Sequence, residues 1–251
     1  MRPNGRSVRI QLLVAEQAAR RGGRIGVVDV CTAAVASLPV SGAGVSAMSR
    51  TAASHPLCST DEISEQLEEL QLTLGEGPCV DAYAQQSAVL TPDLRTAELR
   101  DRWPVFADAA LAAGARAVFA FPLQIGAISP GVLDLYADVP ATLDVEELAD
   151  ALAFADTATL VLLDMRVDAT GAPPDDDALP EDSGEPGGYR AEIDQATGML
   201  TVQLGVGVEE AFVRLRAYAF AHGRRLADVA ADVVARRLRM THDTEPADDD
   251  G

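Results

Sequence analysis

Two kinds of apolar pattern alternate along the first two thirds of the chain. Long amphipathic stretches of helical length and spacing occupy residues 8–20, 25–37, 62–74 and 143–166. Shorter runs bounded by turn residues, typical of strands, occupy residues 42–49, 88–90, 117–125 and 131–137. The last two runs are joined by a predicted turn at 127–130. Strands linked mostly by hairpins, with helices towards the two ends, predict an α+β fold with an antiparallel sheet and not a doubly wound one.

The last part of the chain has only helical spacing. Apolar stripes run along three predicted helices: Ile193, Thr197, Leu200 and Leu204 in 190–204; Val208, Phe212, Leu215 and Ala219 in 208–221; Leu226, Val229, Ala230 and Val233 in 226–238. Three short amphipathic helices predict an all-α three-helix bundle. About 50 residues make a marginal core, so we expect contacts outside the bundle to help to stabilise it.

The two regions are separated by a stretch rich in acid, proline and glycine. Residues 168–188 read DATGAPPDDDALPEDSGEPGG, with almost no large apolar residue, and residues 242–251 have the same character. Such segments bury too little apolar surface to offset the entropy lost on ordering. We therefore predict a first domain at 1–167, a disordered acidic linker at 168–188, a helical domain at 189–240 and a disordered acidic tail at 241–251.

The charge is distributed unevenly along the chain, which matters for nucleic-acid binding. The net charge of −19 opposes binding to a polyanion, but residues 187–240 carry 8 arginines against 6 acidic residues. Every basic residue is arginine, and the chain is rich in alanine, a composition that hints at a GC-rich bacterial genome. The helical domain is thus the part of the chain suited to nucleic acid.

Candidate chemistry is sparse. The three cysteines and three histidines form no metal-ligand or catalytic-triad motif, so we predict no metal, no cofactor and no catalytic residue. No apolar run approaches the length needed to span a membrane, and no secretory leader is evident, so we expect a cytoplasmic protein. Cys79 begins a predicted helix, whose dipole could lower the thiol pKa, which makes Cys79 a possible redox or ligand contact beside the plainer interpretation of core packing.

The first domain resembles a GAF domain over roughly residues 10–166. The resemblance rests on LGEGPCVDAYAQQSAVLTPDL at 74–94, RWPVF at 102–106 and GARAVFAFPLQIGAISPGVLDLY at 114–136, which occur in the expected order. It implies a sensory fold whose antiparallel sheet borders a cavity for an unknown small molecule. Thiol-based methionine sulfoxide reductases share this fold, so an enzyme that uses Cys79 with Cys31 or Cys58 as a resolving thiol stays open as an alternative.

The second domain resembles an ANTAR domain, the RNA-binding module of bacterial transcription antiterminators. The resemblance rests on QATGML, EEAFVRLRAYA and RRLADVA within residues 189–238. It implies binding to RNA hairpin loops in nascent transcripts, often as a homodimer. The candidate RNA-binding residues are Arg190, Gln195, Thr197, Arg214, Tyr218, Arg224 and Arg225. Thr197 stands where many family members have lysine.

These patterns predict a regulator in which the first domain senses a small molecule, a redox state or a partner and controls RNA binding by the second, by masking or by dimerisation. Residues 8–20 and 143–166 are candidates for the dimer interface. A protein-interaction regulator that has lost RNA binding, with Thr197 as its support, is the other alternative.

Overall fold

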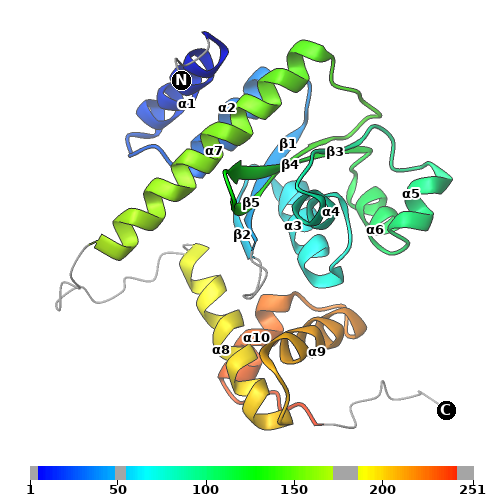
Figure 1. The fold of residues 1–251 in the computed structure, drawn as a ribbon. Helices are drawn as coiled ribbons and strands as arrows, with labels where there is room; N and C mark the ends of the chain where they lie inside the picture. Colours follow the sequence, from blue (N-terminus) through cyan, green and yellow to red (C-terminus); the bar gives the residue numbers. More distant parts are fainter. Residues whose placement is uncertain (1–4, 49–54, 172–185, 242–251) are drawn as a thin grey trace.

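The computed structural model describes residues 5–48, 55–171 and 186–241, which form a sheet domain and a helical bundle (Figure 1). Ten helices and five strands occur in this part of the chain. The strands are β1 (Gly42–Ala47), β2 (His55–Ser59), β3 (Val89–Thr91), β4 (Ala117–Ile125) and β5 (Ile128–Ala137). The helices of the sheet domain are α1 (Gly5–Arg21), α2 (Val27–Ser37), α3 (Glu62–Leu74), α4 (Pro78–Gln85), α5 (Ala97–Arg102), α6 (Phe106–Ala113) and α7 (Val145–Gly171).

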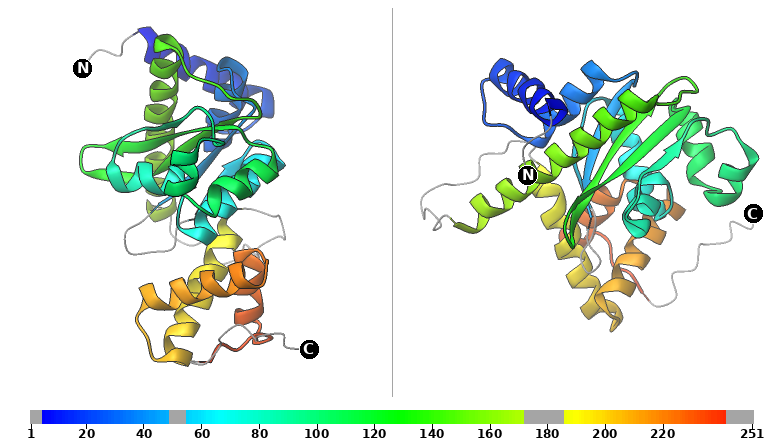
Figure 2. Two further views of the ribbon diagram at one scale, coloured as in Figure 1. Left: turned by 90° about the vertical axis from the view of Figure 1, so that its right-hand side faces the viewer. Right: turned by 45° about the horizontal axis from the view of Figure 1, so that its top comes forward.

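The sheet has the order β2-β1-β5-β4-β3, and every neighbouring pair is antiparallel. Alternate residues of β4 point to opposite faces: Phe119 and Phe121 pack with α1, α2 and α7, whereas Val118 and Ala120 pack with α3, α4 and α6. Both faces of the sheet are therefore covered by helices (Figure 2). The predicted α+β class with an antiparallel sheet is confirmed.

The hairpin between β4 and β5 is tighter than predicted. Gly126 adopts a φ of +58° and makes the turn with Ala127, so β5 begins at Ile128 and not at 131. The register shifts between Leu123 and Ile125, opposite the segment that contains Pro130. Proline has no N–H to donate to a ladder, and such an irregularity accommodates it.

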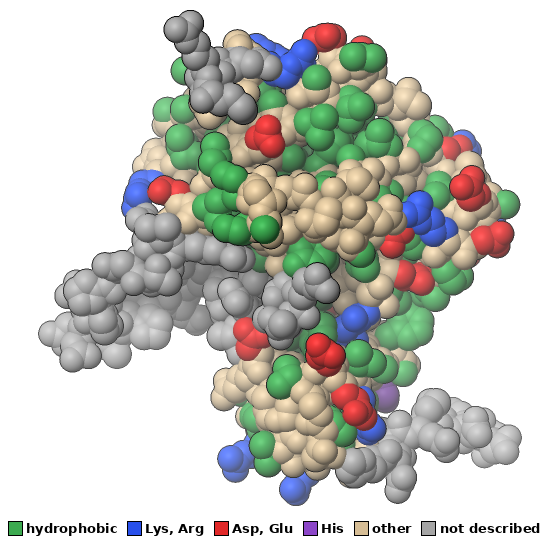
Figure 3. Space-filling view, in the orientation of Figure 1, with side chains coloured by type: hydrophobic (Ala, Val, Ile, Leu, Met, Phe, Trp, Pro, Cys, Tyr) green, Lys and Arg blue, Asp and Glu red, His purple; other side chains and the backbone are tan. Residues whose placement is uncertain are grey.

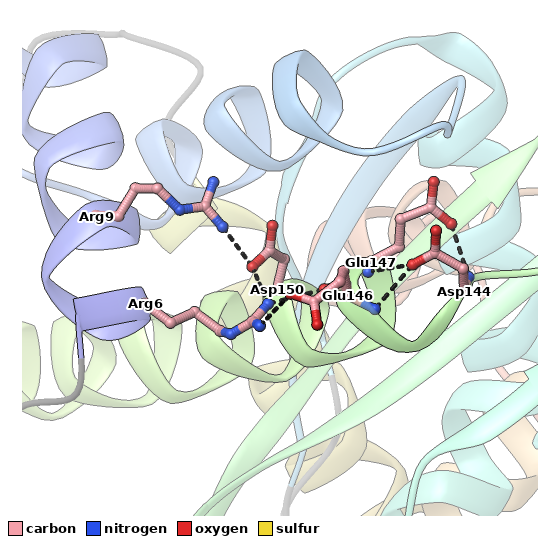
Figure 4. Close-up of polar contacts among 6 residues, drawn as sticks. All are labelled: Arg6, Arg9, Asp144, Glu146, Glu147 and Asp150. Carbon is pink, nitrogen blue, oxygen red and sulfur yellow. Dashed lines mark hydrogen bonds and ion pairs between the residues drawn. The ribbon is translucent and has the colours of Figure 1, made fainter.

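The N-terminal helix packs on α7 of the same chain. Arg6 Nη1 and Arg9 Nη2 each lie 2.5 Å from Asp150 Oδ1, and Arg6 Nη2 lies 2.6 Å from Glu146 Oε2 (Figure 4). At the start of α7, Asp144 Oδ1 accepts hydrogen bonds from the N–H groups of Glu146 and Glu147. The two helices predicted as a dimer interface thus contact each other within one chain.

The helical bundle consists of α8 (Pro186–Leu204), α9 (Val208–Ala221) and α10 (Leu226–Val234). All four predicted stripe residues of α8 and all four of α10 are buried. The predicted stripe of α9 was wrong at Val208, which is 56% exposed. The buried residue nearest the start of α9 is Ala211, one turn later. The predicted helix to 238 was too long, because Arg236 has a φ of +58° and the chain turns there.

The predicted linker 168–188 was too long at both ends. Residues 168–171 continue α7 and residues 186–188 begin α8, where Pro186 fits the first turn because its missing N–H has no helical partner there. Most of the linker and nearly all of the predicted tail lie outside the described residues. Among the described helices, none is both long and apolar enough to cross a bilayer.

Candidate nucleic-acid interface

One flank of α9 carries two of the predicted residues, Arg214 and Tyr218, and both are half-buried. Arg214 forms an ion pair with Glu210 one turn earlier, with a distance of 2.7 Å between Nη2 and Oε1. The ring of Tyr218 stacks on His222 at a centroid distance of 3.9 Å and an interplanar angle of 19°. The stack holds the Tyr218 ring in one orientation, which reduces the entropy lost when a base stacks on it.

The turn between α9 and α10 carries two adjacent arginines with different partners. Arg224 Nη2 lies 2.6 Å from Asp232 Oδ2 on α10, and this bond raises the pKa of Arg224. Arg225 Nη2 lies 2.5 Å from Glu65 Oε1 on α3 of the sheet domain. One arginine therefore stabilises the bundle, and its neighbour contacts the other domain.

The predicted residues of α8 fall in different places. Gln195 is exposed, whereas the side chain of Arg190 lies outside the described set. Thr197 is only 4% exposed, and its hydroxyl donates to the Ile193 carbonyl at 2.7 Å. We correct the expectation for Thr197, because a buried hydroxyl that is already bonded one turn back serves core packing and is not presented to RNA.

A second arginine group borders Gln195. Arg236 and Arg239, in the segment after α10, line a hollow of about 630 Å³ together with Gln195 and Gln203. Blue arginine side chains project from the end of the bundle that lies away from the sheet domain (Figure 3). Arg236 and Arg239 are not among the RNA-binding residues predicted from the sequence. The left-handed residue that turns the segment back towards α8 gave no usable signal in the sequence.

An acidic helix of the sheet domain faces the arginine turn. A groove of about 900 Å³ separates α3 and α6 from the α9–α10 turn, and its lining includes Glu62, Glu65 and Glu69 opposite Arg224 and Arg225. Besides the Arg225–Glu65 pair, Glu69 Oε1 accepts a hydrogen bond from the Leu226 N–H at 2.7 Å. The acids of α3 thus occupy the positions that phosphate oxygens would take beside these donors.

Arg216 makes the third polar contact between the two domains. Its Nε donates to the Thr73 carbonyl at 3.0 Å, near the end of α3. A Cβ at Gly75 would clash with its guanidinium, so a larger residue there would have to displace the end of the Arg216 side chain. Leu72 of α3 joins the apolar core of the bundle, which adds a hydrophobic contact to the polar ones.

Beneath this contact lies a small buried polar cluster. A cavity of about 140 Å³ is lined by residues of the sheet domain that include Glu68, Gln71 and Cys79, and by Phe212 and Arg216 of α9. Glu68 accepts a hydrogen bond from Ser46, and Gln71 Nε2 donates to Asp134 Oδ2 at 2.9 Å. Typical sites for small organic ligands are about 300–1,000 Å³, so this cavity suits only a very small molecule or ion in the present conformation.

Burial disfavours the ionised form of both carboxyl groups in this cluster. Burial raises the pKa of Asp134 to about 6, and burial together with the Asp134 charge raises the pKa of Glu68 well above its usual range. One ligand atom each from Glu68, Cys79 and Asp134 lies within 4.8 Å of the others, a set that could hold a divalent ion. A proton shared between the two carboxyl groups would reduce the repulsion between Glu68 and Asp134 without a metal.

Cys79 is not activated by the start of its helix. Its thiol is 2% exposed, and burial and the Asp134 and Glu68 charges raise its pKa well above the usual range. Its Sγ lies 4.0 Å from Met48 Sδ, whereas Cys31 Sγ lies 2.9 Å from Cys58 Sγ. Burial therefore outweighs the helix dipole at Cys79, which favours the core-packing interpretation, and the free thiols of Cys31 and Cys58 lie beside each other and not beside Cys79.

The model of the ANTAR domain family matches residues 189–234. No curated protein matches the chain. Among solved structures, the GAF domain of a phosphoenolpyruvate-protein phosphotransferase from Acinetobacter is similar, with 10% identity, a TM-score of 0.47, and coverage of 68% of this chain and 100% of that one. The GAF3 domain of a Synechocystis protein has 16% identity and a TM-score of 0.45, and covers 59% of this chain and 97% of that one.

A type II free methionine-R-sulfoxide reductase from Thermoplasma acidophilum is also similar, with 14% identity and a TM-score of 0.42 over 62% of this chain and 94% of that one. These identities concern the fold alone. Residues 189–234 are an ANTAR domain, and it follows a domain with a five-stranded antiparallel sheet that is similar to GAF domains.

Proposed function

We propose that this protein is a bacterial, non-enzymatic regulator of transcription antitermination whose ANTAR domain binds hairpin loops in nascent transcripts. The match of that family to residues 189–234 is the observation that carries the proposal. The exposed arginines of a domain in an otherwise acidic chain support it, because phosphate contacts supply most of the affinity for nucleic acid.

Two surfaces of the helical bundle contact the RNA. Tyr218 supplies an oriented ring on which a loop base can stack, with the Arg214 guanidinium one turn away for a phosphate. The hollow between Gln195, Arg236 and Arg239 supplies further cations and an amide for the second strand or the second loop. Arg225 joins the first surface when it leaves Glu65.

The sheet domain controls access to RNA by masking. Arg225 and the Leu226 N–H are both occupied by carboxylates of α3, so RNA must displace the acids before it can use these donors. The sensed signal acts on the polar cavity directly below the contact, which includes side chains of both domains. Exposed leucines on α1 and α7, Leu12, Leu152 and Leu160, support a homodimer through that outer layer.

Binding of a two-hairpin RNA by the full chain tests the proposal. We expect Tyr218→Ala to weaken binding about tenfold, since stacking of one base on an aromatic ring contributes about 1–3 kcal/mol. Arg239→Ala should weaken binding by a smaller factor, and Arg100→Ala on α5 of the sheet domain, which removes the same charge, should leave it unchanged. No binding by the wild type at low salt, or equal binding by all four proteins, would refute RNA binding and favour a protein partner.

Masking is tested separately by removing an acid that contacts the turn. Glu65→Gln should increase RNA affinity about two- to fivefold, because the Arg225 and Glu65 side chains are 54% and 52% exposed and such a pair is worth at most about 1 kcal/mol. Glu98→Gln changes the net charge equally but lies on α5, so it controls for long-range repulsion. Equal affinities for Glu65→Gln and Glu98→Gln would contradict masking while leaving RNA binding intact.

A further inference from the structure

Two of the three cysteines lie side by side in the sheet domain. Cys31 lies in the middle of α2 and Cys58 near the end of β2, 27 residues later, and their Sγ atoms are 2.9 Å apart. A disulfide needs about 2.05 Å between the sulfurs, so a small side-chain movement would close the gap.

The two thiols differ in their access to solvent. Cys31 is fully buried in the core between α2 and the sheet, whereas Cys58 is partly exposed on β2. The neighbouring Cys58, burial and the charge of Glu68 all raise the pKa of Cys31. A solute can therefore reach Cys58 first, with Cys31 held as a protonated thiol directly beside it.

We propose that Cys31 and Cys58 form a reversible disulfide on reaction with a hydroperoxide, which makes the sheet domain a thiol redox sensor. In the first step the Cys58 thiolate attacks the terminal peroxide oxygen, the O–O bond breaks, an alcohol or water leaves, and Cys58 becomes a sulfenic acid. In the second step Cys31 sulfur attacks Cys58 sulfur, the S–O bond breaks, and its oxygen leaves as water with the Cys31 proton. Two thiols lose two electrons, and the peroxide gains them.

The disulfide would affect the helical bundle through one strand, β2. β2 is one of the two edge strands of the sheet, and it contacts α2 of the sheet domain and α8 of the ANTAR domain. A bond from Cys58 to α2 fixes β2 to the core and changes the surface against which α8 lies. An effect of this bond on RNA affinity rests on the proposed function, but formation of the bond does not.

Thiol counting on the full chain tests the disulfide. Reduced wild type is treated with hydrogen peroxide, denatured and alkylated, and its intact mass and crosslinked peptides are measured. We expect two of the three thiols to be lost, a Cys31–Cys58 peptide to appear, and dithiothreitol to restore all three thiols. Cys79→Ser should behave like wild type, whereas Cys31→Ser should stop at a sulfenic acid on Cys58 that a dimedone probe labels.

Three alkylated cysteines after peroxide treatment, or a crosslink that involves Cys79, would overturn the proposal, and the wild-type protein alone gives this answer. RNA affinity is then compared between oxidised and reduced wild type, with Cys58→Ser as the control for other effects of peroxide. A change of about fivefold or more in wild type alone is the expected coupling. A disulfide without that change would refute the coupling, and loss of RNA binding in both forms would refute the proposed function.

Discussion

Asp134→Asn replaces a buried carboxyl group by an amide of the same shape. In the wild type, Gln71 Nε2 donates to Asp134 Oδ2, and an asparagine oxygen can accept the same bond. The substitution therefore removes an ionisable group from the polar cluster and leaves its volume and this hydrogen bond in place. It removes the free-energy cost of the ionised form of Asp134, together with the effect of that charge on the pKa of Glu68.

The expected magnitude follows from the pKa of Asp134. Burial raises this pKa from the usual 3.8 to about 6 in the folded chain, which corresponds to about 3 kcal/mol. Because the folded chain binds the proton more tightly, the favourable contribution is complete below about pH 4 and is lost as the pH rises through about 6. Asp134→Asn should thus match the wild type at pH 4 and be more stable by about 3 kcal/mol at pH 7.

Urea unfolding at a series of pH values measures this difference. Trp103 is the single tryptophan and packs in the core between the sheet and α3, α4 and α6. Its fluorescence therefore reports the unfolding of the sheet domain. Asp101→Asn, at an exposed position on α5, controls for the change in net charge. The difference between Asp134→Asn and wild type should grow between pH 4 and 7, while Asp101→Asn stays close to wild type.

A wild type that is equally stable or more stable than Asp134→Asn at pH 7 would refute the reasoning. The ionised carboxylate would then have a favourable partner. If a chelator also destabilised the wild type and not Asp134→Asn, that partner would be a cation held by Glu68, Cys79 and Asp134.

Two further substitutions test the contact between the domains and the core of the bundle. Gly75→Ala strains a residue with a φ of +67° and displaces Arg216, so amides of α3 and α9 should exchange hydrogen faster, whereas Gly126→Ala strains a similar turn with open space around it and should leave those amides unchanged. Equal exchange in both variants would mean that Arg216 does not depend on Gly75. Leu200→Ala should lower the unfolding free energy of the bundle by about 2–5 kcal/mol, read from the slowest amides of α8 to α10, and the exposed Val202→Ala should lower it by less than 1 kcal/mol. A small loss for Leu200→Ala would mean that the bundle core collapses around the missing side chain.

Helical and strand periodicity predicted the elements whose burial repeats along the sequence. The stripe of α10 is of this kind, because each residue's environment is fixed by its own element. The apolar run at 117–125 predicted β4, which is buried along most of its length. β2 was not predicted: Pro56 lies within a five-residue strand, and its pairing with β1 includes a register shift. The short helices α5 and α6 were missed as well, because six and eight residues give too little periodicity.

The candidate site was less predictable than the fold. Arg225 was found as a cation in a turn, but its partner Glu65 lies 160 residues away and belongs to a pattern that indicates only a solvated helix face. The Cys31–Cys58 pair and the buried Glu68–Asp134 pair likewise join distant elements. Local sequence predicts which face of a helix is buried, and it does not predict which distant side chain comes to lie there.

The pairing of Arg225 with Glu65 affects how ionic strength should act on RNA binding. A free arginine that meets a phosphate releases a counterion, and each such contact steepens the loss of affinity with salt. Arg225 instead exchanges its ion pair with Glu65 for an ion pair with a phosphate. Added salt weakens both ion pairs, so its two effects on the RNA affinity contributed by Arg225 largely cancel. Arg239, for which no ion pair with a described residue is seen, should contribute fully to the salt slope, whereas Arg225 contributes little until Glu65 is removed.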